Sequence, residues 1–334
     1  MTDRRPPSPS RRLLLLAGTA AMLVPATARA QQSGTAKLPG IGFLTNGAGE
    51  HALSPLTAGV VTELERLGWV NGRSAIYEPR YSAGDPGRFP GFATDLVDRK
   101  VNVIMAGSTS AAKAAQIATA TIPIVALADD MEEAGLVASI ARPGSNITGV
   151  SIFGSALDQK RLELLVEMVP AARRMAVLTD SKTRPSVAQV AAHAHRLGIE
   201  LVLIEAPSLD RLGSALDAVA TAREVDAVNV LASSVLYNGR RAIIDRLAAS
   251  RLPAIFEWPE YAAEGALMGY GPTQALISRL VAELIDRVLK GVSPAELPVL
   301  RATKFELAIN LKTAKALGLT VSPTLLARAD EVIE

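Results

Sequence analysis

The feature that most constrains the fold of this chain is a regular alternation of short apolar runs and amphipathic stretches, which begins near Gly40. The apolar runs are four to six residues long, rich in β-branched residues and separated by turn signals. Such runs are typical of strands that are buried on both faces of a parallel sheet. We predict eleven strands, at 41–45, 75–79, 101–106, 122–127, 147–152, 175–179, 200–205, 227–232, 254–257, 267–270 and 305–310.

The stretches between these strands have helical spacing. In 53–67, for example, apolar residues recur every three or four positions, and Gly68 follows as a helix-ending residue. Alternating strands and helices predict an α/β fold with parallel sheets. Eleven strands suit two open sheets better than one eight-stranded barrel.

We therefore predict two Rossmann-like lobes, and we place the crossings between them in turn-rich stretches. The stretches chosen contain turn-forming residues and are 142–148 (RPGSNIT), 257–266 with Pro259 and Gly265, and 291–298 from Gly291 to Pro298. The resulting division assigns 38–148 and 265–292 to lobe 1, and 149–264 and 293–334 to lobe 2.

The first thirty residues have the pattern of a cleaved export signal. Arg11 and Arg12 precede an apolar run at 13–24, and a small-residue cleavage site follows at 28–30. As a helix the run would span only about 18 Å, against the ~30 Å of a hydrocarbon core, so a membrane anchor is the weaker alternative. We expect a soluble periplasmic protein from about Gln31, without stable membrane insertion. The arginine pair partly fits a twin-arginine signal, and the general secretory route remains open.

Charge and cysteine content exclude several classes of function. Residues 1–30 contribute +4 to a total charge of +2, which leaves −2 for the other 304 residues. A mildly acidic body without basic blocks argues against a nucleic-acid partner. The absence of cysteine excludes disulfides, thiolate metal sites, a cysteine nucleophile and a lipid-modified N-terminal cysteine.

No arrangement of residues in the sequence indicates catalysis. His193 and His195 would diverge by about 200° on one helix and could not share a metal. The glycines at 40–42 lack the third glycine of a dinucleotide loop, and 149–154 has one residue too many for a nucleophile elbow. We predict no catalytic residue, no metal and no cofactor.

Polar residues follow several predicted strands, where α/β proteins place ligand groups. Asp129 comes directly after the apolar run 122–128. Gly107, Ser108 and Thr109 follow the run 101–106 and open a helix, whose free amides favour an anion such as a carboxylate. Ordinary N-capping by either hydroxyl residue is the alternative.

Other strand ends add polar residues that could each be a turn or a cap. Facing one another, they would form a cleft with hydrogen-bonding walls. They are Thr45, Asn46, Asp180, Ser233, Ser234 and Glu257. Four aromatic residues crowd into 256–270, among them Tyr270. A ring there could stack on a planar ligand, or it could fill core near a hinge.

Short motifs along almost the whole body of the chain are specific when taken jointly. They are 41–44 (IGFL), 63–68 (ELERLG), 71–73 (NGR), 84–86 (GDP), 135–144 (GLVASIARPG), 146–149 (NITG), 303–307 (TKFEL), 310–314 (NLKTA) and 330–334 (DEVIE). With these motifs the chain resembles the substrate-binding proteins of ABC-type importers, which have the type I periplasmic binding fold. It is most similar to the subgroup whose better-known members bind aromatic amino acids, tryptophan and tyrosine.

This resemblance implies two lobes joined by three hinge crossings, which close on a small molecule. The turn at 107–109 looks like the family's turn for a ligand carboxylate, and Asp129 looks like the acid that receives a ligand ammonium. The stretch 128–131 (ADDM) lacks the family's glycine and proline and is one residue shorter, which leaves Asp129 and Asp130 both open.

We therefore expect a periplasmic receptor, not an enzyme, that delivers a small polar or zwitterionic, amino-acid-like solute to an ABC-type membrane permease. Ser108 and Thr109 would bind a carboxylate and Asp129 an ammonium. Recognition of the rest of the solute would fall to Asn46, Asp180, Ser233, Ser234, Glu257 and Tyr270. Alternatives are a periplasmic α/β hydrolase, the sensing lobe of a sugar repressor, and a receptor for a sensor kinase or secondary transporter.

Overall fold

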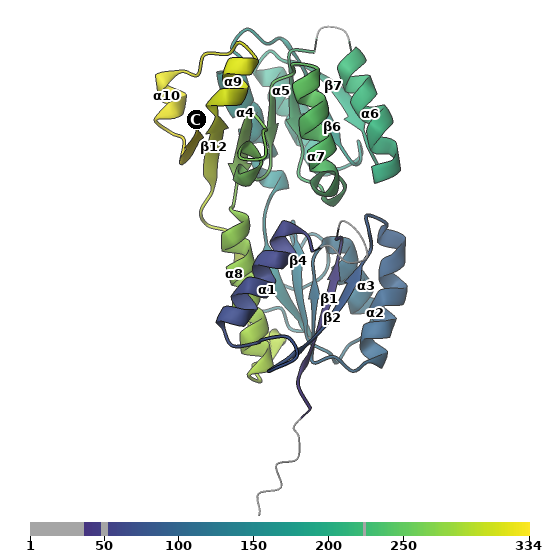
Figure 1. Cartoon of the computed structure of the whole chain (residues 1–334). Helices are drawn as coiled ribbons and strands as arrows, with labels where there is room; N and C mark the ends of the chain where they lie inside the picture. Colours follow the sequence, from purple (N-terminus) through teal and green to yellow (C-terminus); the bar gives the residue numbers. More distant parts are fainter. Residues whose placement is uncertain (1–36, 48–52, 223–224) are drawn as a thin grey trace, which may run out of the picture. The chain divides into compact units, whose positions relative to one another are not determined.

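A computed structural model of the protein describes residues 37–47, 53–222 and 225–334 (Figure 1). The segment Leu38–Glu334 forms one compact unit. The predicted export signal lies outside the described residues. In the part of the chain that is described, no helix is both long enough and apolar enough to cross a membrane.

The first sheet has six parallel strands in the order β11-β5-β4-β3-β1-β2. Its strands are β1 (Gly40–Thr45), β2 (Ile76–Tyr81), β3 (Val103–Ala106), β4 (Ile124–Ala128), β5 (Ile147–Ser151) and β11 (Leu300–Arg301). Neighbouring residues on a strand point to opposite faces, so Phe43 and Leu44 of β1 enter two different hydrophobic clusters.

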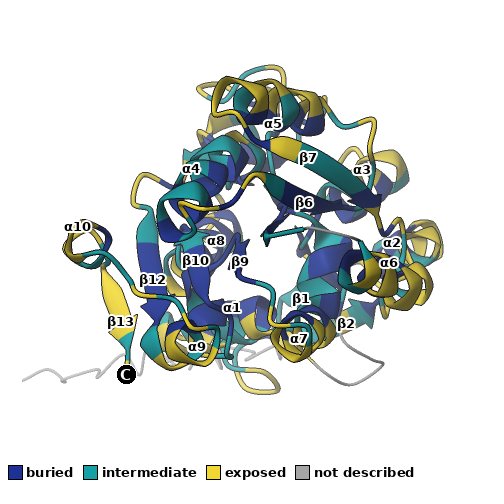
Figure 2. Ribbon diagram, turned by 90° about the horizontal axis from the view of Figure 1, so that it is seen from above, coloured by how far each residue is buried: buried dark blue, intermediate teal, exposed yellow. Residues whose placement is uncertain are grey.

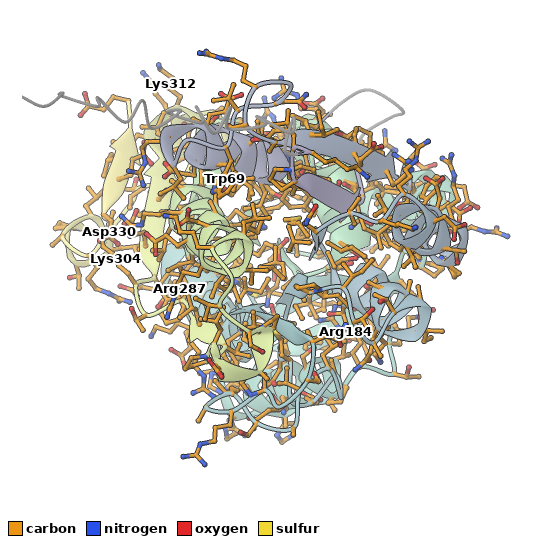
Figure 3. The ribbon with its side chains drawn as sticks, turned by 90° about the horizontal axis from the view of Figure 1, so that it is seen from below. Trp69, Arg184, Arg287, Lys304, Lys312 and Asp330 are labelled. Carbon is orange, nitrogen blue, oxygen red and sulfur yellow. The ribbon has the colours of Figure 1, made fainter. Side chains whose placement is uncertain are left out.

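Helices cover both faces of this sheet. The helices α1 (Pro55–Arg66) and α8 (Gln274–Leu289) pack side by side and share one cluster, while α2 (Phe89–Asp98) and α3 (Thr109–Ala118) share the other (Figure 1). Trp69, labelled in Figure 3, fastens α8 to the end of α1 because its Nε1 donates to Asp286 Oδ1 at 3.0 Å. We call this sheet with its four helices the first lobe.

The second sheet has seven strands in the order β13-β12-β10-β9-β8-β6-β7, and only the β10–β12 pair is antiparallel. Its strands are β6 (Arg174–Thr179), β7 (Glu200–Glu205), β8 (Ala227–Val230), β9 (Ala254–Phe256), β10 (Met268–Gly271), β12 (Glu306–Asn310) and β13 (Glu331–Ile333). Figure 2 shows the central strands β9 and β10 buried and the edge strand β13 exposed.

Helices also flank the second sheet. The pair α4 (Asp158–Met168) and α5 (Pro185–Arg196) packs in one cluster, and the pair α6 (Leu209–Thr221) and α7 (Ser234–Ala249) packs in another. Two short helices, α9 (Leu311–Ala316) and α10 (Pro323–Leu326), follow β12. The 3-10 turns are η1 (Pro86–Arg88), η2 (Ser155–Leu157), η3 (Pro259–Ala262) and η4 (Pro294–Glu296). We call the second sheet with its helices the second lobe.

The predicted α/β fold with two mostly parallel sheets is confirmed, and all eleven predicted strands are present within a few residues of their predicted bounds. Two strands were not predicted, β11 and β13. They are two and three residues long, too short for a periodic apolar signal, and they are defined by the strands they pair with.

The positions predicted for the crossings are corrected by the strand pairing. Strands β5 and β11 belong to the first sheet and β10 to the second, so the chain crosses after β5, after β10 and after β11. Each crossing lies several residues later than 148, 264 and 292. Gly144, Gly265 and Gly291 have positive φ, and each makes a turn within a single lobe and not between lobes. Turn-forming residues therefore placed the predicted lobe boundaries too early in the chain.

Candidate functional site

A cavity of about 470 Å³ lies where the carboxyl ends of strands from both sheets meet. Nine of the ten predicted site residues line it, and these nine are the ones predicted from the strand ends: Thr45, Asn46, Ser108, Thr109, Asp129, Asp180, Ser233, Ser234 and Glu257. The rule that strand ends carry ligand groups therefore gathers residues from both lobes at one place.

Tyr270 is the exception, because it is not among the residues that line the cavity. Its ring centroid lies 6.5 Å from that of Phe305, and it packs on the cluster that includes Leu307. The neighbouring residues of β10 explain the difference. Gly269 and Gly271 approach the backbone of the turn after β9, so Tyr270 between them points to the opposite face of the sheet.

The two neighbouring acids after β4 have different surroundings. Asp129 lines the cavity, and its Oδ1 accepts a hydrogen bond from the amide of Ser155 at 3.0 Å. Asp130 Oδ1 instead accepts from the amides of Glu132 at 2.9 Å and Glu133 at 3.1 Å, as a turn-capping residue does. Of the two acids, Asp129 therefore lines the cavity and Asp130 does not.

Two serines both cap a helix and line the cavity. Ser108 is the N-cap of α3, where its Oγ accepts from the amide of Ala111 at 3.2 Å. Ser233 is the N-cap of α7 and donates to Asp180 Oδ2 at 2.8 Å. The capping alternative is thus observed. It also directs the partial positive charge of two helix N-termini toward the cavity.

Arg184, labelled in Figure 3, is a lining residue that the sequence analysis missed. It stands at the N-cap position of α5 and donates to Asp180 Oδ1 at 3.0 Å, to the carbonyl of Ala232 at 2.6 Å and to Ser155 Oγ at 2.8 Å. Arg184 and Ser233 thus each contact one carboxylate oxygen of Asp180. The sequence contains one signal that could have identified Arg184: it is a basic residue four positions after the strand-end acid Asp180.

A fully buried ion pair lies behind the cavity wall. The Arg161 and Asp158 side chains of α4 are both 0% exposed and are joined at 2.7 Å. Arg161 also donates to the carbonyls of Gly154 and Tyr270, each at 2.8 Å, and to that of Glu257 at 3.4 Å. It thereby ties the first crossing and strand β10 to the residue that follows β9. In the sequence, this i, i+3 pair resembles an exposed helix pair.

Glu257 is the lining acid whose charge is most affected by its surroundings. The residue is 8% exposed. Burial raises the pKa of Glu257 to about 8; Arg161 opposes the rise, and Asp158 and Asp129 add to it. Burial likewise raises the pKa of Asp158 to about 6, against the opposing charges of Arg161 and Arg184. Desolvation disfavours the ionised form of a carboxyl group, and the nearby arginines compensate for it only in part.

An aromatic pair and an unpaired hydroxyl complete the wall. The rings of Tyr237 and Trp258 meet edge to face with centroids 6.2 Å apart, and both residues line the cavity. Tyr237 Oη accepts from the amide of Leu56 at the start of α1, so this contact joins the two lobes. Thr45 is 2% exposed, and within the described chain its Oγ1 has no hydrogen-bond partner. A polar ligand atom would satisfy it.

The site has the composition of a binding cleft. Among residues 37–47, 53–222 and 225–334, no group of three or more acidic or histidine side chains could hold a metal ion. In the same part of the chain, no histidine lines the cavity. The cavity offers three acids, two basic residues, hydroxyl groups, helix N-termini and aromatic ring edges; the acids are Asp129, Asp180 and Glu257, and the bases are Lys113 and Arg184.

Comparisons with known proteins agree with this geometry. The profile of a family described as ABC transporter substrate binding protein matches residues 49–333. The chain is 27% identical over 275 residues to a tyrosine-binding protein of Clostridioides difficile (strain R20291), which covers 81% of this chain and 79% of that protein.

Solved structures show the same fold. The structure of an ABC domain in complex with L-Trp from Streptococcus pneumonia has a TM-score of 0.78 and 24% identity, and the match covers 89% of this chain and all of that one. The ligand-free, open structure of a substrate-binding protein with adhesive properties from Clostridium difficile has a TM-score of 0.60 and 22% identity, covering 89% of this chain and 99% of that one.

Proposed function

We infer that this chain, which belongs to the ABC transporter substrate-binding protein family, works as the solute-binding receptor of an ABC importer and hands its solute to the membrane permease. The single observation that carries this function is the cavity between two lobes. Its walls come from the strand ends of both sheets, and three chain crossings connect the lobes. Lobes joined in this way can close around a small molecule by hinge motion.

We propose that the solute is a zwitterionic amino acid with an aromatic side chain. Asp129 would receive the ammonium group, and Ser108 and Thr109 at the start of α3 would receive the carboxylate. Tyr237 and Trp258 would contact the side chain through their ring edges and faces. A relative that is named a tyrosine-binding protein supports this class of ligand, as does the composition of the cavity.

The protein would bind its solute without converting it. Nucleophilic catalysis needs a nucleophile within hydrogen-bond reach of a base, and in the described part of the chain the lining serines have no histidine beside them. Recovery of unchanged amino acid from the complex after prolonged incubation is the expected result. A product that accumulates with time would favour the hydrolase alternative.

We also propose that residues 1–30 direct export and are then removed, so that the receptor acts in the periplasm. The arginine pair, the short apolar run and the small-residue cleavage site support this. N-terminal sequencing of the protein recovered from the periplasm should begin at about Gln31. A sequence that begins at Met1 would contradict the proposal.

A ligand screen tests the function directly. Thermal unfolding with each of the twenty amino acids should show the largest rise in Tm for tyrosine, tryptophan or phenylalanine, because a ligand stabilises the state that binds it by RT ln(1 + [L]/Kd). Analogues that lack the ammonium or the carboxylate should bind at least tenfold more weakly in calorimetry. Stabilisation by sugars or polyols alone would contradict the ligand class.

A further inference from the structure

Glu257 directly follows the carboxyl end of β9, and two neighbouring residues hold its backbone carbonyl in place. Its carbonyl accepts a hydrogen bond from Arg161 at 3.4 Å. Gly271 of the adjacent strand packs so closely that a Cβ there would lie 2.1 Å from the Glu257 carbonyl oxygen. The residue lines the cavity and is 8% exposed, so its carboxyl group lies in the cavity wall.

Two acids, one from each lobe, converge on the same point of this wall. A Cβ placed on Gly154 would lie 3.4 Å from Asp129 Oδ1 and 3.8 Å from Glu257 Oε2. Gly154 lies at the first crossing between the lobes and is packed against Ala232, whose Cβ would lie 2.9 Å from an added Cβ, so these distances show only that the two carboxyl groups approach one another at the cavity wall. A positively charged group in the cavity that both acids line could contact an acid of the first lobe and an acid of the second.

The charges around Glu257 are already committed to other partners. Arg161 is paired with Asp158, and Arg184 with Asp180. The remaining ionisable groups that act on Glu257 or line the cavity are Asp129 at the end of β4, Lys113 on α3, Tyr237 on α7 and Tyr261 in η3. Neither phenol supplies a positive charge. The charge of Arg161 and a hydrogen bond from Trp258 lower the pKa of Glu257 without overcoming burial, and Lys113 is not among the groups that shift it. A cation that enters beside the Glu257 carboxyl group would therefore favour its ionised form further.

The unpaired hydroxyl of Thr45 independently marks this cavity as a place for a ligand. It lies in the same wall and is 2% exposed, and its Oγ1 has no partner among the described residues. An unsatisfied buried hydroxyl costs free energy, which a polar ligand atom recovers. The two acids thus face a space that the fold has prepared for a polar molecule.

We propose that Asp129 and Glu257 together hold the positively charged nitrogen of the bound solute, and that Glu257 releases its proton to solvent as that nitrogen enters. This deepens the proposed function and rests on it. The carboxylic acid of Glu257 and the free ammonium become a carboxylate–ammonium pair, and one proton leaves to solvent. Release follows because burial holds the pKa of Glu257 near 8 in the empty cavity, and a cation within 4–6 Å lowers a carboxyl pKa by about 1–3 units.

Capture of the solute would then depend on pH. Between pH 6 and 8, affinity for a solute with an ammonium group should rise about tenfold or more, because a lowered pKa in the complex favours binding at higher pH. Above the pKa of the solute's own ammonium the gain ends. A solute that lacks the nitrogen should bind with no such dependence.

Proton counting by calorimetry tests the proposal. L-tyrosine and L-tryptophan are titrated into the wild-type protein at pH 7 in phosphate and in Tris, whose ionisation enthalpies differ, and 3-(4-hydroxyphenyl)propionate serves as the probe without nitrogen. We expect release of more than half a proton per amino acid and none for the propionate. Glu257→Gln, which keeps the shape and cannot ionise, should abolish both the release and the pH dependence. Glu133→Gln, on an exposed acid outside the cavity, should retain them.

The possible outcomes distinguish failure of the proposed role of Glu257 from failure of the proposed receptor function. Binding of either amino acid without proton release in the wild type would overturn the role of Glu257 and leave the receptor function standing. Release that persists in Glu257→Gln would assign the proton to another group, with Asp158 the first candidate, and would also overturn it. If no amino acid binds, both the ligand class and this inference fail.

Discussion

At the scale of single residues, Asp129 and Asp130 give the sharpest test of the site. Asp129→Asn should weaken binding of L-tyrosine or L-tryptophan tenfold or more, because a hydrogen bond to a charged group contributes about 1.5–3 kcal/mol. Asp130→Ala should leave that affinity unchanged and lower the free energy of unfolding by about 1 kcal/mol, since it removes the cap on the amides of Glu132 and Glu133. Calorimetry and urea unfolding measure the two effects. Equal losses of affinity would contradict the distinction between the acids.

Glu257 should also make the stability of the empty protein depend on pH. Its pKa is about 8 in the folded state, against 4.5 for an ordinary glutamate, so between these values the folded state binds more protons than the unfolded state. Stability contributed by the protonated acid is therefore lost as pH rises from about 4.5 to 8, by up to roughly 1.4 kcal/mol per pH unit. Urea unfolding between pH 5 and 8 should show Glu257→Gln gaining stability over the wild type as pH rises. A constant difference would contradict the raised pKa.

At the scale of elements, the sequence predicts the strands that have a local apolar pattern. It does not predict the strands that exist only because they pair with a neighbouring strand. The apolar runs predict eleven strands because a strand buried on both faces needs such a run whichever strands flank it. The two-residue strand β11 exists only through its pairing with β5. The first crossing contains Phe153 at φ 49°, a conformation that no residue preference would suggest.

The same distinction applies to the cavity. Strand ends converge by topology, which is why nine predicted residues meet there. Arg184 is instead the N-cap residue of α5, and Tyr237 lies in the first turn of α7; the orientation of both helices is set by helix packing. Arg161 was not recognised because an i, i+3 ion pair has the same sequence whether it is exposed or, as here, 0% exposed.

Glycines in two elements should respond oppositely to alanine. A Cβ on Gly269 of β10 would lie 2.1 Å from the carbonyl oxygen of Trp258, so Gly269→Ala should destabilise the protein by about 1–3 kcal/mol. It should also weaken ligand binding by displacing the turn that carries Glu257. A Cβ on Gly213, inside α6, meets nothing within 4 Å, and Gly213→Ala should stabilise by about 0.4–1 kcal/mol. Chemical unfolding and calorimetry of both variants measure this contrast, and a shared direction would refute it.

For the whole molecule, contacts between the lobes away from the cavity should help to set affinity. A Cβ on Gly84, in the first lobe, would lie 2.3 Å from Cδ1 of Leu209, which begins α6 in the second lobe. The Leu209 side chain thus packs over Gly84, and on α1 the amide of Leu56 meets Tyr237 Oη at 3.3 Å. Both contacts disappear when the lobes separate, so they stabilise only the state in which the cavity is enclosed.

Leu209→Ala should therefore weaken ligand binding about threefold to tenfold, because truncating a partly buried leucine removes on the order of 1 kcal/mol from the closed state and a ligand must supply that difference. The Tm of the ligand-free protein should change little if that protein is mainly open. Ile117→Ala, on a residue that is 87% exposed, is the matched control and should bind as the wild type does. Solution scattering should show the radius of gyration of the wild type falling on addition of L-tyrosine or L-tryptophan, and Leu209→Ala needing more ligand for the same fall. An unchanged radius in the wild type at saturating ligand would show that capture does not proceed by closure of the lobes.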